Sequence, residues 1–375
     1  YISTRGQAPS LTFEDVVLTG LASDGGLYLP ETMPTFSKEE IASMAGMSYQ
    51  DLAFKVMAPF VAGEVPDADL KKIIDKSYST FRHTAIAPLV QTAHNEFILE
   101  LFQGPTLAFK DFALQFLGNL LDYILVKRDQ KVVVMGATSG DTGSAAIEGC
   151  RHCEHVDIFI LYPDGRVSDV QRRQMTTVEG DNVHNLAVRG NFDDCQALVK
   201  ASFVGERFLP DGRSLVAVNS INWARIMAQI VYYGYASLRF ADGCCFAVPT
   251  GNFGNVFAAF LAKKMGFPID KLIVATNEND ILHRFFQNGD YSRGQTHFTL
   301  SPAMDIQVAS NFERYLYYQS GCDTAQLGRF MDEFNHFGKV TLQGLSKDEM
   351  IVSTAVNSNE MLDALRDVKR RSGYL

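Results

Sequence analysis

The sequence has no apolar run of 18 residues and no segment with the pattern of a secretory signal peptide. We therefore expect that no part of it spans a membrane. Basic residues are also in the minority, because 34 Lys and Arg stand against 43 Asp and Glu, which gives a net charge of -9. A protein of this charge is a poor non-specific binder of nucleic acid, so we expect no nucleic-acid partner.

Several metal and nucleotide motifs are missing. Of six cysteines, Cys150 and Cys153 form a C-x-x-C, but no second pair follows at zinc spacing. The histidines show neither H-x-x-H nor H-E-x-x-H, so we expect no metal. No P-loop, Gly-x-Ser-x-Gly or kinase signature occurs. Reduced thiols fit a cytoplasmic enzyme.

The chain of 375 residues suggests two domains. Ser37 with Glu40 predicts a capped helix over 37–58, and further helices are expected over 67–82 and 222–240. Apolar strands alternate with helices, which predicts an α/β fold with parallel sheets covered on both faces. The expected strands are 96–101, 131–135, 156–161, 183–188, 215–218, 245–248 and 272–275. Phe330, Phe334 and Phe337 recur at helical spacing and are expected in the core, as is the Cys244-Cys245 pair that opens a strand.

One lysine stands out. Lys110 follows the apolar residues Leu107, Ala108 and Phe109 and precedes a helix with one apolar face. A helix N-terminus disfavours a cation, and an apolar environment disfavours any charge, so both favour the neutral amine that forms a Schiff base. A solvated lysine at the start of a helix explains this stretch equally well.

Two loops that follow strands are rich in Gly, Ser, Thr and Asn, namely 137–143 and 250–255. Their backbone N–H groups could hold an anion at the carboxyl end of a parallel sheet. Either loop alone could be an ordinary turn. Together with Lys110 they predict a cofactor with a phosphate and an aldehyde, next to a second anion, which is the chemistry of pyridoxal phosphate and an amino acid.

Three motifs carry a resemblance to a known family: Gly-Pro-Thr-Leu-Ala-Phe-Lys-Asp at 104–111, Ala-Thr-Ser-Gly-Asp-Thr-Gly at 137–143 and Pro-Thr-Gly-Asn-Phe-Gly-Asn at 249–255. Together they resemble the threonine synthases, in their longer bacterial and fungal form. The resemblance extends over essentially the whole chain and includes Asn-Ser-Ile-Asn-Trp-Ala-Arg at 219–225 and Ser-Asn-Phe-Glu-Arg at 310–314. It implies a fold-type II pyridoxal-phosphate enzyme, like the tryptophan synthase β subunit, with its active site in a cleft between two parallel-sheet α/β domains. We expect a large domain of residues 1–100 plus 220–375 and a small domain of residues 101–219.

The implied reaction converts O-phospho-L-homoserine and water to L-threonine and phosphate, the last step of threonine biosynthesis. In this resemblance Lys110 is the catalytic Schiff-base lysine. The residues implied to hold the cofactor phosphate are Gly251, Asn252, Phe253, Gly254 and Asn255. Those implied to bind the substrate are Thr138, Ser139, Gly140, Asp141, Thr142, Asn191, Asn222 and Arg225.

Alternatives stay open for part of this set. Asn191 and Asn222 could each cap a helix, and Arg225 could be a solvated surface residue. A threonine or serine dehydratase, or a phospho-lyase, would share Lys110 and both loops. The family contributes a Ser or Thr near its C-terminus to the pyridine nitrogen, and no match follows Leu375. We expect a chain shortened or disordered at its end, and also shortened at its start, where Tyr1 stands in place of Met. Monomer and homodimer remain possible.

Overall fold

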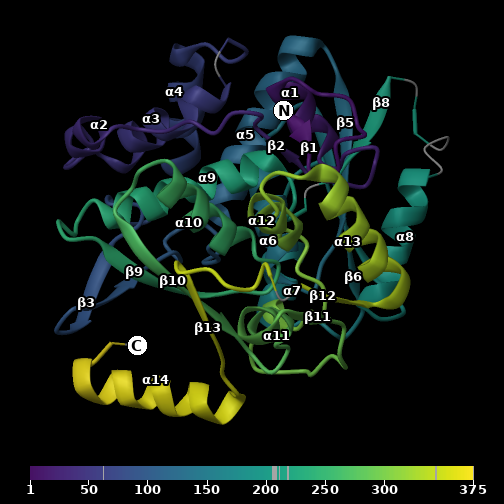
Figure 1. The fold of residues 1–375 in the computed structure, drawn as a ribbon. Coiled ribbons are helices and arrows are strands. Elements are labelled where there is room, and N and C mark those ends of the chain that lie inside the picture. Colours follow the sequence, from purple (N-terminus) through teal and green to yellow (C-terminus); the bar gives the residue numbers. More distant parts are fainter. Residues whose placement is uncertain (62, 205–208, 211, 218, 343, 375) are drawn as a thin grey trace.

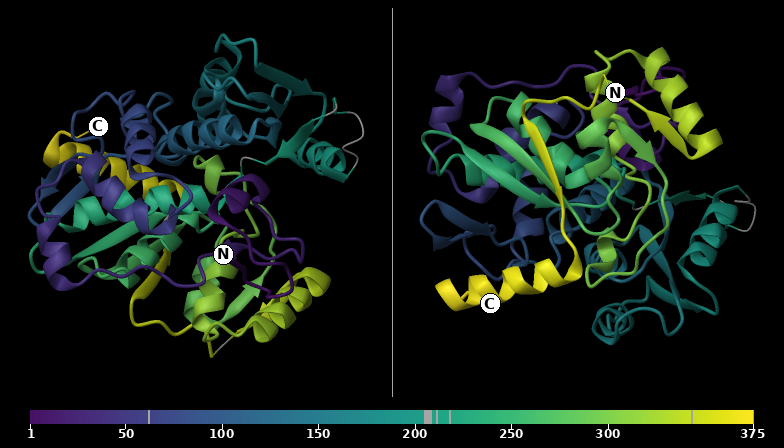
Figure 2. Two further views of the ribbon diagram at one scale, coloured as in Figure 1. Left: turned by 90° about the horizontal axis from the view of Figure 1, so that it is seen from above. Right: turned by 60° about the horizontal axis from the view of Figure 1, so that its bottom comes forward.

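The computed structural model describes residues 1–61, 63–204, 209–210, 212–217, 219–342 and 344–374. A four-stranded parallel sheet has the strand order β7-β6-β5-β8. Its strands are β5 (Lys131–Ala137), β6 (Val156–Pro163), β7 (Val183–Val188) and β8 (Arg213–Val216). Its connecting helices are α6 (Asp141–Cys150), α7 (Asp169–Thr176) and α8 (Phe192–Val204). Figure 2 shows these strands and helices gathered in a lobe of their own.

A second parallel sheet has the order β13-β10-β9. Its strands are β9 (Cys244–Pro249), β10 (Ile269–Thr276) and β13 (Ile351–Ala355). The helices of this half are α9 (Trp223–Ser237), α10 (Gly254–Lys264), α11 (Ile281–Asn288), α12 (Phe312–Gln319), α13 (Thr324–Phe337) and α14 (Ser358–Ser372). Both α10 and α11 pack on β10. In Figure 1, α14 lies along the outside of the molecule, and none of its residues is buried.

The N-terminal residues form a helical layer beside these sheets (Figure 1). Its elements are β1 (Ile2–Ser3), α1 (Phe13–Thr19), β2 (Tyr28–Leu29), α2 (Lys38–Ser43), α3 (Tyr49–Val61) and α4 (Asp67–Tyr78). Two small antiparallel pairs complete the fold, β3 (Leu89–Ala93) with β4 (Glu96–Leu99), and β11 (Asp290–Ser292) with β12 (Lys339–Thr341). A short 3-10 turn, η2, spans Pro302–Met304.

Helix α9 lies at the centre of the core. Every residue from Trp223 to Ser237 is buried, and the helix packs against α1, α3, α5 (Asp111–Arg128) and α10. A helix that is apolar on all sides belongs in an interior. Two polar side chains in it, Arg225 and Gln229, are therefore buried with it and need partners there.

Helices α5 and α6 approach each other unusually closely. A Cβ added at Gly118 of α5 would lie 2.0 Å from the carbonyl oxygen of Gly149 in α6, and one at Gly149 would lie 2.4 Å from the carbonyl oxygen of Leu114. Only glycine fits at both positions, because the two backbones touch. Since Lys110 directly precedes α5 and Asp141 opens α6, this contact fixes two elements that carry site residues relative to each other.

The structure confirms most of the expected elements, including the capping box of Ser37 and Glu40. The single helix expected over 37–58 is wrong, because the chain breaks at the turn between α2 and α3. Strand β13 was not expected, and neither was β3, the partner of β4. The strands of the first sheet lie between residues 101 and 219 and those of the second between 220 and 375, whereas the domain boundaries remain a prediction. Val218, the last residue of one expected strand, lies outside the described residues.

Two expected core positions are also wrong. Phe334 is buried, but Phe337, the last residue of α13, is 65% exposed, because the helix ends there and turns its final residue outward. Cys245 is exposed and Cys244 only half-buried.

Candidate active site

The segment before α5 is a closed loop. The buried carboxylate of Asp111 accepts hydrogen bonds from the backbone N–H of Thr106 at 2.8 Å and from its hydroxyl at 2.7 Å. A Cβ at Gly104 would lie 2.5 Å from Asp111, so the turn closes directly on this side chain. From α7, the Gln174 amide donates to the Thr106 carbonyl at 2.9 Å. Asp111 and Gln174 thus hold the loop that presents Lys110, and neither was expected to do so.

The Lys110 amine points to the first turn of α6. It donates to Asp141 Oδ1 at 2.8 Å and to Thr142 Oγ1 at 2.7 Å, and only 14% of its side chain is exposed. Burial lowers the pKa of Lys110, and the nearby Asp141 carboxylate partly opposes that shift. The direction agrees with the desolvated lysine that the sequence suggested, and a solvated lysine does not fit these contacts.

The loop after β5 folds around a threonine. Thr138 is buried, and its hydroxyl accepts the N–H groups of Gly140 at 3.0 Å and Gly143 at 2.8 Å. Gly140 takes φ +146°, which L side chains rarely adopt. The N–H groups of Asp141 and Thr142 open α6 and have no acceptor inside the helix, which is the arrangement of an anion site.

The loop after β9 has a similar design. The Thr250 hydroxyl donates to Asn255 Oδ1 at 2.6 Å and accepts the Phe253 N–H at 3.2 Å. Phe253 takes φ +64° and is fully buried, so its ring anchors the loop in the core. Asn255 Nδ2 donates to the carbonyl of Pro249 at 2.8 Å. The side chains of this loop therefore bind the protein, which leaves backbone N–H groups at the start of α10 for a ligand.

Residues that follow η2 brace this loop from outside. Ser310 Oγ donates to Asn252 Oδ1 at 2.9 Å, and the Asn311 N–H donates to the Asn252 carbonyl at 3.0 Å. Asn311 in turn accepts from the buried Arg314 at 2.6 Å. A Cβ at Gly254 would lie 3.1 Å from Asn311 Nδ2, so this position has little room for a side chain.

Arg225, near the start of α9, is 3% exposed, and its Nε and Nη1 have no hydrogen-bond partner among the described residues. Burial lowers the pKa of Arg225 to about 10, and the Asp141 charge partly opposes that shift. Its own charge contributes to the lowered pKa of Lys110. A buried guanidinium without an acceptor is costly, so an anionic ligand would remove a penalty here. The surface reading of Arg225 is wrong.

The two asparagines of the expected substrate set are helix caps. Asn222 is 1% exposed; its Oδ1 accepts the Ala224 N–H at 3.0 Å and its Nδ2 donates to the Val17 carbonyl at 2.9 Å. Asn191 is exposed and shares a reciprocal cap with Asp194 at the start of α8. A role of either asparagine in binding substrate remains a prediction.

Comparison with known proteins identifies the family of this chain. The model for the threonine synthase N terminus matches residues 1–78, and the model for pyridoxal-phosphate dependent enzymes matches residues 84–327. A threonine synthase of Pseudomonas aeruginosa is 58% identical over 100% of this chain and 81% of its own length. The chain belongs to the threonine synthase family. It is a pyridoxal-phosphate-dependent lyase with the fold-type II architecture.

Solved structures of the family support the assignment. The pyridoxal-phosphate-bound threonine synthase of Brucella melitensis has a TM-score of 0.96 at 48% identity, covering 100% of this chain and 82% of that one. The yeast enzyme has a TM-score of 0.93 at 44% identity, covering 99% and 79%. Maize serine racemase, at 14% identity and a TM-score of 0.55, covers 81% and 80% and shares the fold alone. Among the described residues, no helix is long and apolar enough to cross a bilayer.

Proposed function

We propose that this chain converts O-phospho-L-homoserine and water to L-threonine and phosphate in the cytoplasm, as a monomer or a homodimer. Membership of the threonine synthase family supports the reaction. The observation that carries the residue assignment is the buried guanidinium of Arg225, whose Nε and Nη1 have no partner among the described residues and whose charge acts on the Lys110–Asp141 pair. The substrate's phosphate is the anion that this group lacks. The six free cysteines favour the cytoplasm.

The residues present fit pyridoxal phosphate. Lys110 would carry the cofactor, because it is a buried lysine with a lowered pKa. The backbone of Gly251, Asn252, Phe253, Gly254 and Asn255 would bind the cofactor phosphate at the start of α10. The Phe253 N–H is already bonded to Thr250, so the other N–H groups of the loop are the available donors. When bound, the cofactor supplies an electron sink that makes the substrate's Cα–H acidic.

Different side chains would then transfer protons, position the amine and stabilise the departing phosphate. The Lys110 amine takes and returns protons at the substrate carbon, and the burial that lowers its pKa favours the neutral amine that acts as the base. Asp141 and Thr142 accept hydrogen bonds from this amine and hold it in place. Arg225 offers to the departing phosphate a full positive charge and the N–H groups of Nε and Nη1, which bond to nothing in the described part of the chain.

The first turn of α6 would bind the substrate's carboxylate. Thr138 shapes this turn through its hydroxyl, and Ser139 and Gly140 lie at its entrance. The N–H groups of Asp141 and Thr142 point along the helix axis at its positive end. Asn191 and Asn222, which start helices of their own, would contribute only from their present capping positions.

Replacement of Lys110 tests the proposal. Lys110→Ala should fold but lose all turnover, together with the cofactor that borohydride fixes covalently to the protein. Lys127→Ala, which removes a half-exposed lysine at the other end of α5, is the matched control and should keep both. Activity of Lys110→Ala above ~1% of wild type, a barrier increase under about 3 kcal/mol, contradicts the assignment. Product analysis tests the reaction itself, because 2-oxobutyrate in place of threonine would indicate a dehydratase.

A further inference from the structure

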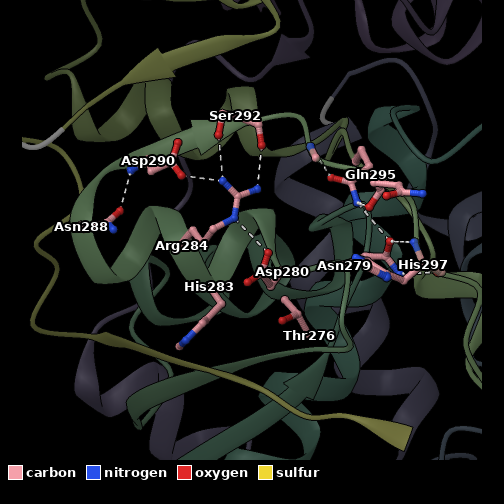
Figure 3. Close-up of polar contacts among 12 residues, drawn as sticks. Thr276, Asn279, Asp280, His283, Arg284, Asn288, Asp290, Ser292, Gln295 and His297 are labelled. Carbon is pink, nitrogen blue, oxygen red and sulfur yellow. Dashed lines mark hydrogen bonds and ion pairs between the residues drawn. The ribbon is translucent and has the colours of Figure 1, made fainter.

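A long irregular segment crosses the carboxyl end of β10. From Arg293 to Ser301 it forms neither helix nor strand, and side chains from elsewhere bond to its backbone. The Asn279 amide does this by pairing with both backbone groups of His297: it accepts the N–H at 2.9 Å and donates to the carbonyl at 2.8 Å. Gln307 joins Asn279 to the carbonyl of Gln295, with 3.0 Å to each. Figure 3 shows this group around Asn279.

Asp305 is the centre of the same cluster. Its Oδ1 accepts from Asn277 Nδ2 at 2.6 Å, from the Thr299 hydroxyl at 2.7 Å and from Asn279 Nδ2 at 3.2 Å. Its Oδ2 accepts the Thr299 N–H at 2.9 Å. Asn277 and Asn279 are 7% and 3% exposed, so one carboxylate gathers four neutral donors at a largely buried site. Such a set fixes the segment to the end of β10.

This anchored segment lies against the loop after β9. A Cβ at Gly251 would lie 3.2 Å from Met304 Cα, 3.3 Å from the Ala303 carbonyl oxygen and 3.3 Å from Ile306 Cγ1. The backbone around Asp305 is therefore packed on Gly251. A few residues later Ser310 and Asn311 bond to Asn252. Residues 303–311 thus form a wall along the outer side of the loop, and Asp305 holds one end of it.

We propose that Asp305 is a positioning residue for the cofactor phosphate: through the wall of residues 303–311 it keeps the N–H groups of Gly251 and Asn252 directed at the phosphate. This rests on the proposed function, in which the loop after β9 binds that phosphate. In this proposal Asp305 acts through Asn277, Asn279 and Thr299, to which it is bonded, and not on the phosphate directly. Its effect should therefore appear in the binding of a phosphate-bearing cofactor and be absent for a cofactor without phosphate.

A neighbouring cluster supplies the matched control. Arg284 donates to Asp280 at 2.9 Å, to Asp290 at 2.5 Å and to Ser292 Oγ at 2.8 Å, which ties α11 to β11. Figure 3 shows it beside the Asn279 group, with comparable polar contacts but on a separate set of residues. Arg284→Met should lower the Tm through loss of these bonds and leave the loop after β9 in place.

The experiment compares pyridoxal phosphate with pyridoxal on the cofactor-free protein, by absorbance titration. Asp305→Ala should raise the Kd for pyridoxal phosphate at least tenfold and change that for pyridoxal less than twofold. Asp305→Asn, which keeps one acceptor oxygen, should fall between wild type and Asp305→Ala. Arg284→Met should leave the ratio of the two Kd values as in wild type. If Asp305→Ala does not fold, Thr299→Val removes one donor to the same carboxylate and should raise the pyridoxal phosphate Kd alone.

Gly254→Val tests whether the loop after β9 binds the phosphate, independently of the role of Asp305, because it places a side chain in the loop itself. If it weakens binding of pyridoxal phosphate and the Asp305 variants do not alter the Kd ratio, Asp305 is only structural and our inference is overturned. If Gly254→Val also leaves the Kd within a factor of two, the phosphate lies elsewhere and the proposed loop assignment fails. Parallel losses for pyridoxal and pyridoxal phosphate in Asp305→Ala would likewise overturn the positioning role.

Discussion

Arg225→Met should make the cofactor-free protein more stable. The wild-type side chain buries a charge with two unpaired donors, Nε and Nη1, within the described part of the chain. Each unsatisfied buried donor costs about 1–3 kcal/mol, and methionine keeps most of the apolar stem that packs in α9. After some loss of packing, we expect a net gain of about 1–3 kcal/mol in the free energy of unfolding. The measurement is urea unfolding of the cofactor-free protein.

The same change should weaken catalysis. A hydrogen bond to a charged group contributes about 1.5–3 kcal/mol, so kcat/KM for O-phospho-L-homoserine should fall roughly ten- to a hundredfold. Inhibition by a phosphonate analogue of the substrate should weaken in parallel, while cofactor affinity stays near normal. Burial is the main cause of the lowered pKa of Lys110, and the Arg225 charge adds to it. The variant's pH profile should therefore shift upward on its acid limb. Phosphate release measured across pH, with and without the phosphonate, gives kcat/KM, the inhibition and the pH profile.

Arg239→Met, which replaces an exposed arginine just beyond the end of α9, is the control. It should change neither the free energy of unfolding nor kcat/KM. Our reasoning fails if Arg225→Met keeps kcat/KM within a factor of two of wild type. It also fails if the variant loses its cofactor while phosphonate inhibition is unchanged, since Arg225 would then serve the other phosphate.

The fold also predicts the effects of two other substitutions on stability. Burial raises the pKa of Asp111 to about 6 from its ordinary 3.8, so the unfolded chain loses this proton at a lower pH than the folded protein does. As pH rises from 4 to 6, the free energy of unfolding of the wild type should therefore fall by about 2–3 kcal/mol relative to Asp111→Asn. Equal pH dependence of the two proteins in urea titrations would show that the carboxyl is not perturbed. Gly118→Ala would set a methyl group 2.0 Å from the Gly149 carbonyl oxygen and should destabilise the protein by about 3 kcal/mol or more; a Tm unchanged from wild type would contradict the close helix contact.

Sequence patterns predicted what depends on local periodicity. The strands of both sheets other than β13, the Ser37 cap and the position of Lys110 before α5 follow from residues within one turn or one strand of each other. The direction of the pKa shift of Lys110 was also predicted, but its stated cause was wrong in part, because the neighbouring Leu107 is 49% exposed. The caps at Asn191 and Asn222 were among the readings that the sequence left open.

What the sequence did not predict depends on distant partners. Strand β13 joins β10 across 75 residues or more, and its short apolar stretch carries no signal of that pairing. The ion pair of Lys110 with Asp141 required the packing of α5 on α6. Asp305 resembles any polar loop residue until Asn277 and Thr299 are seen to meet on it. That Nε and Nη1 of Arg225 have no partner within the described ranges is visible only once α9 is seen to be buried on all sides.

The glycine contact between α5 and α6 has a consequence for motion. Because Gly118 and Gly149 leave no space between the two backbones, the helices cannot slide past each other without breaking that contact. The contact joins α5 to the last turn of α6, and the Lys110 amine bonds to the first turn of the same helix. Any movement that keeps this contact would therefore leave the Lys110 amine next to its acceptors on α6.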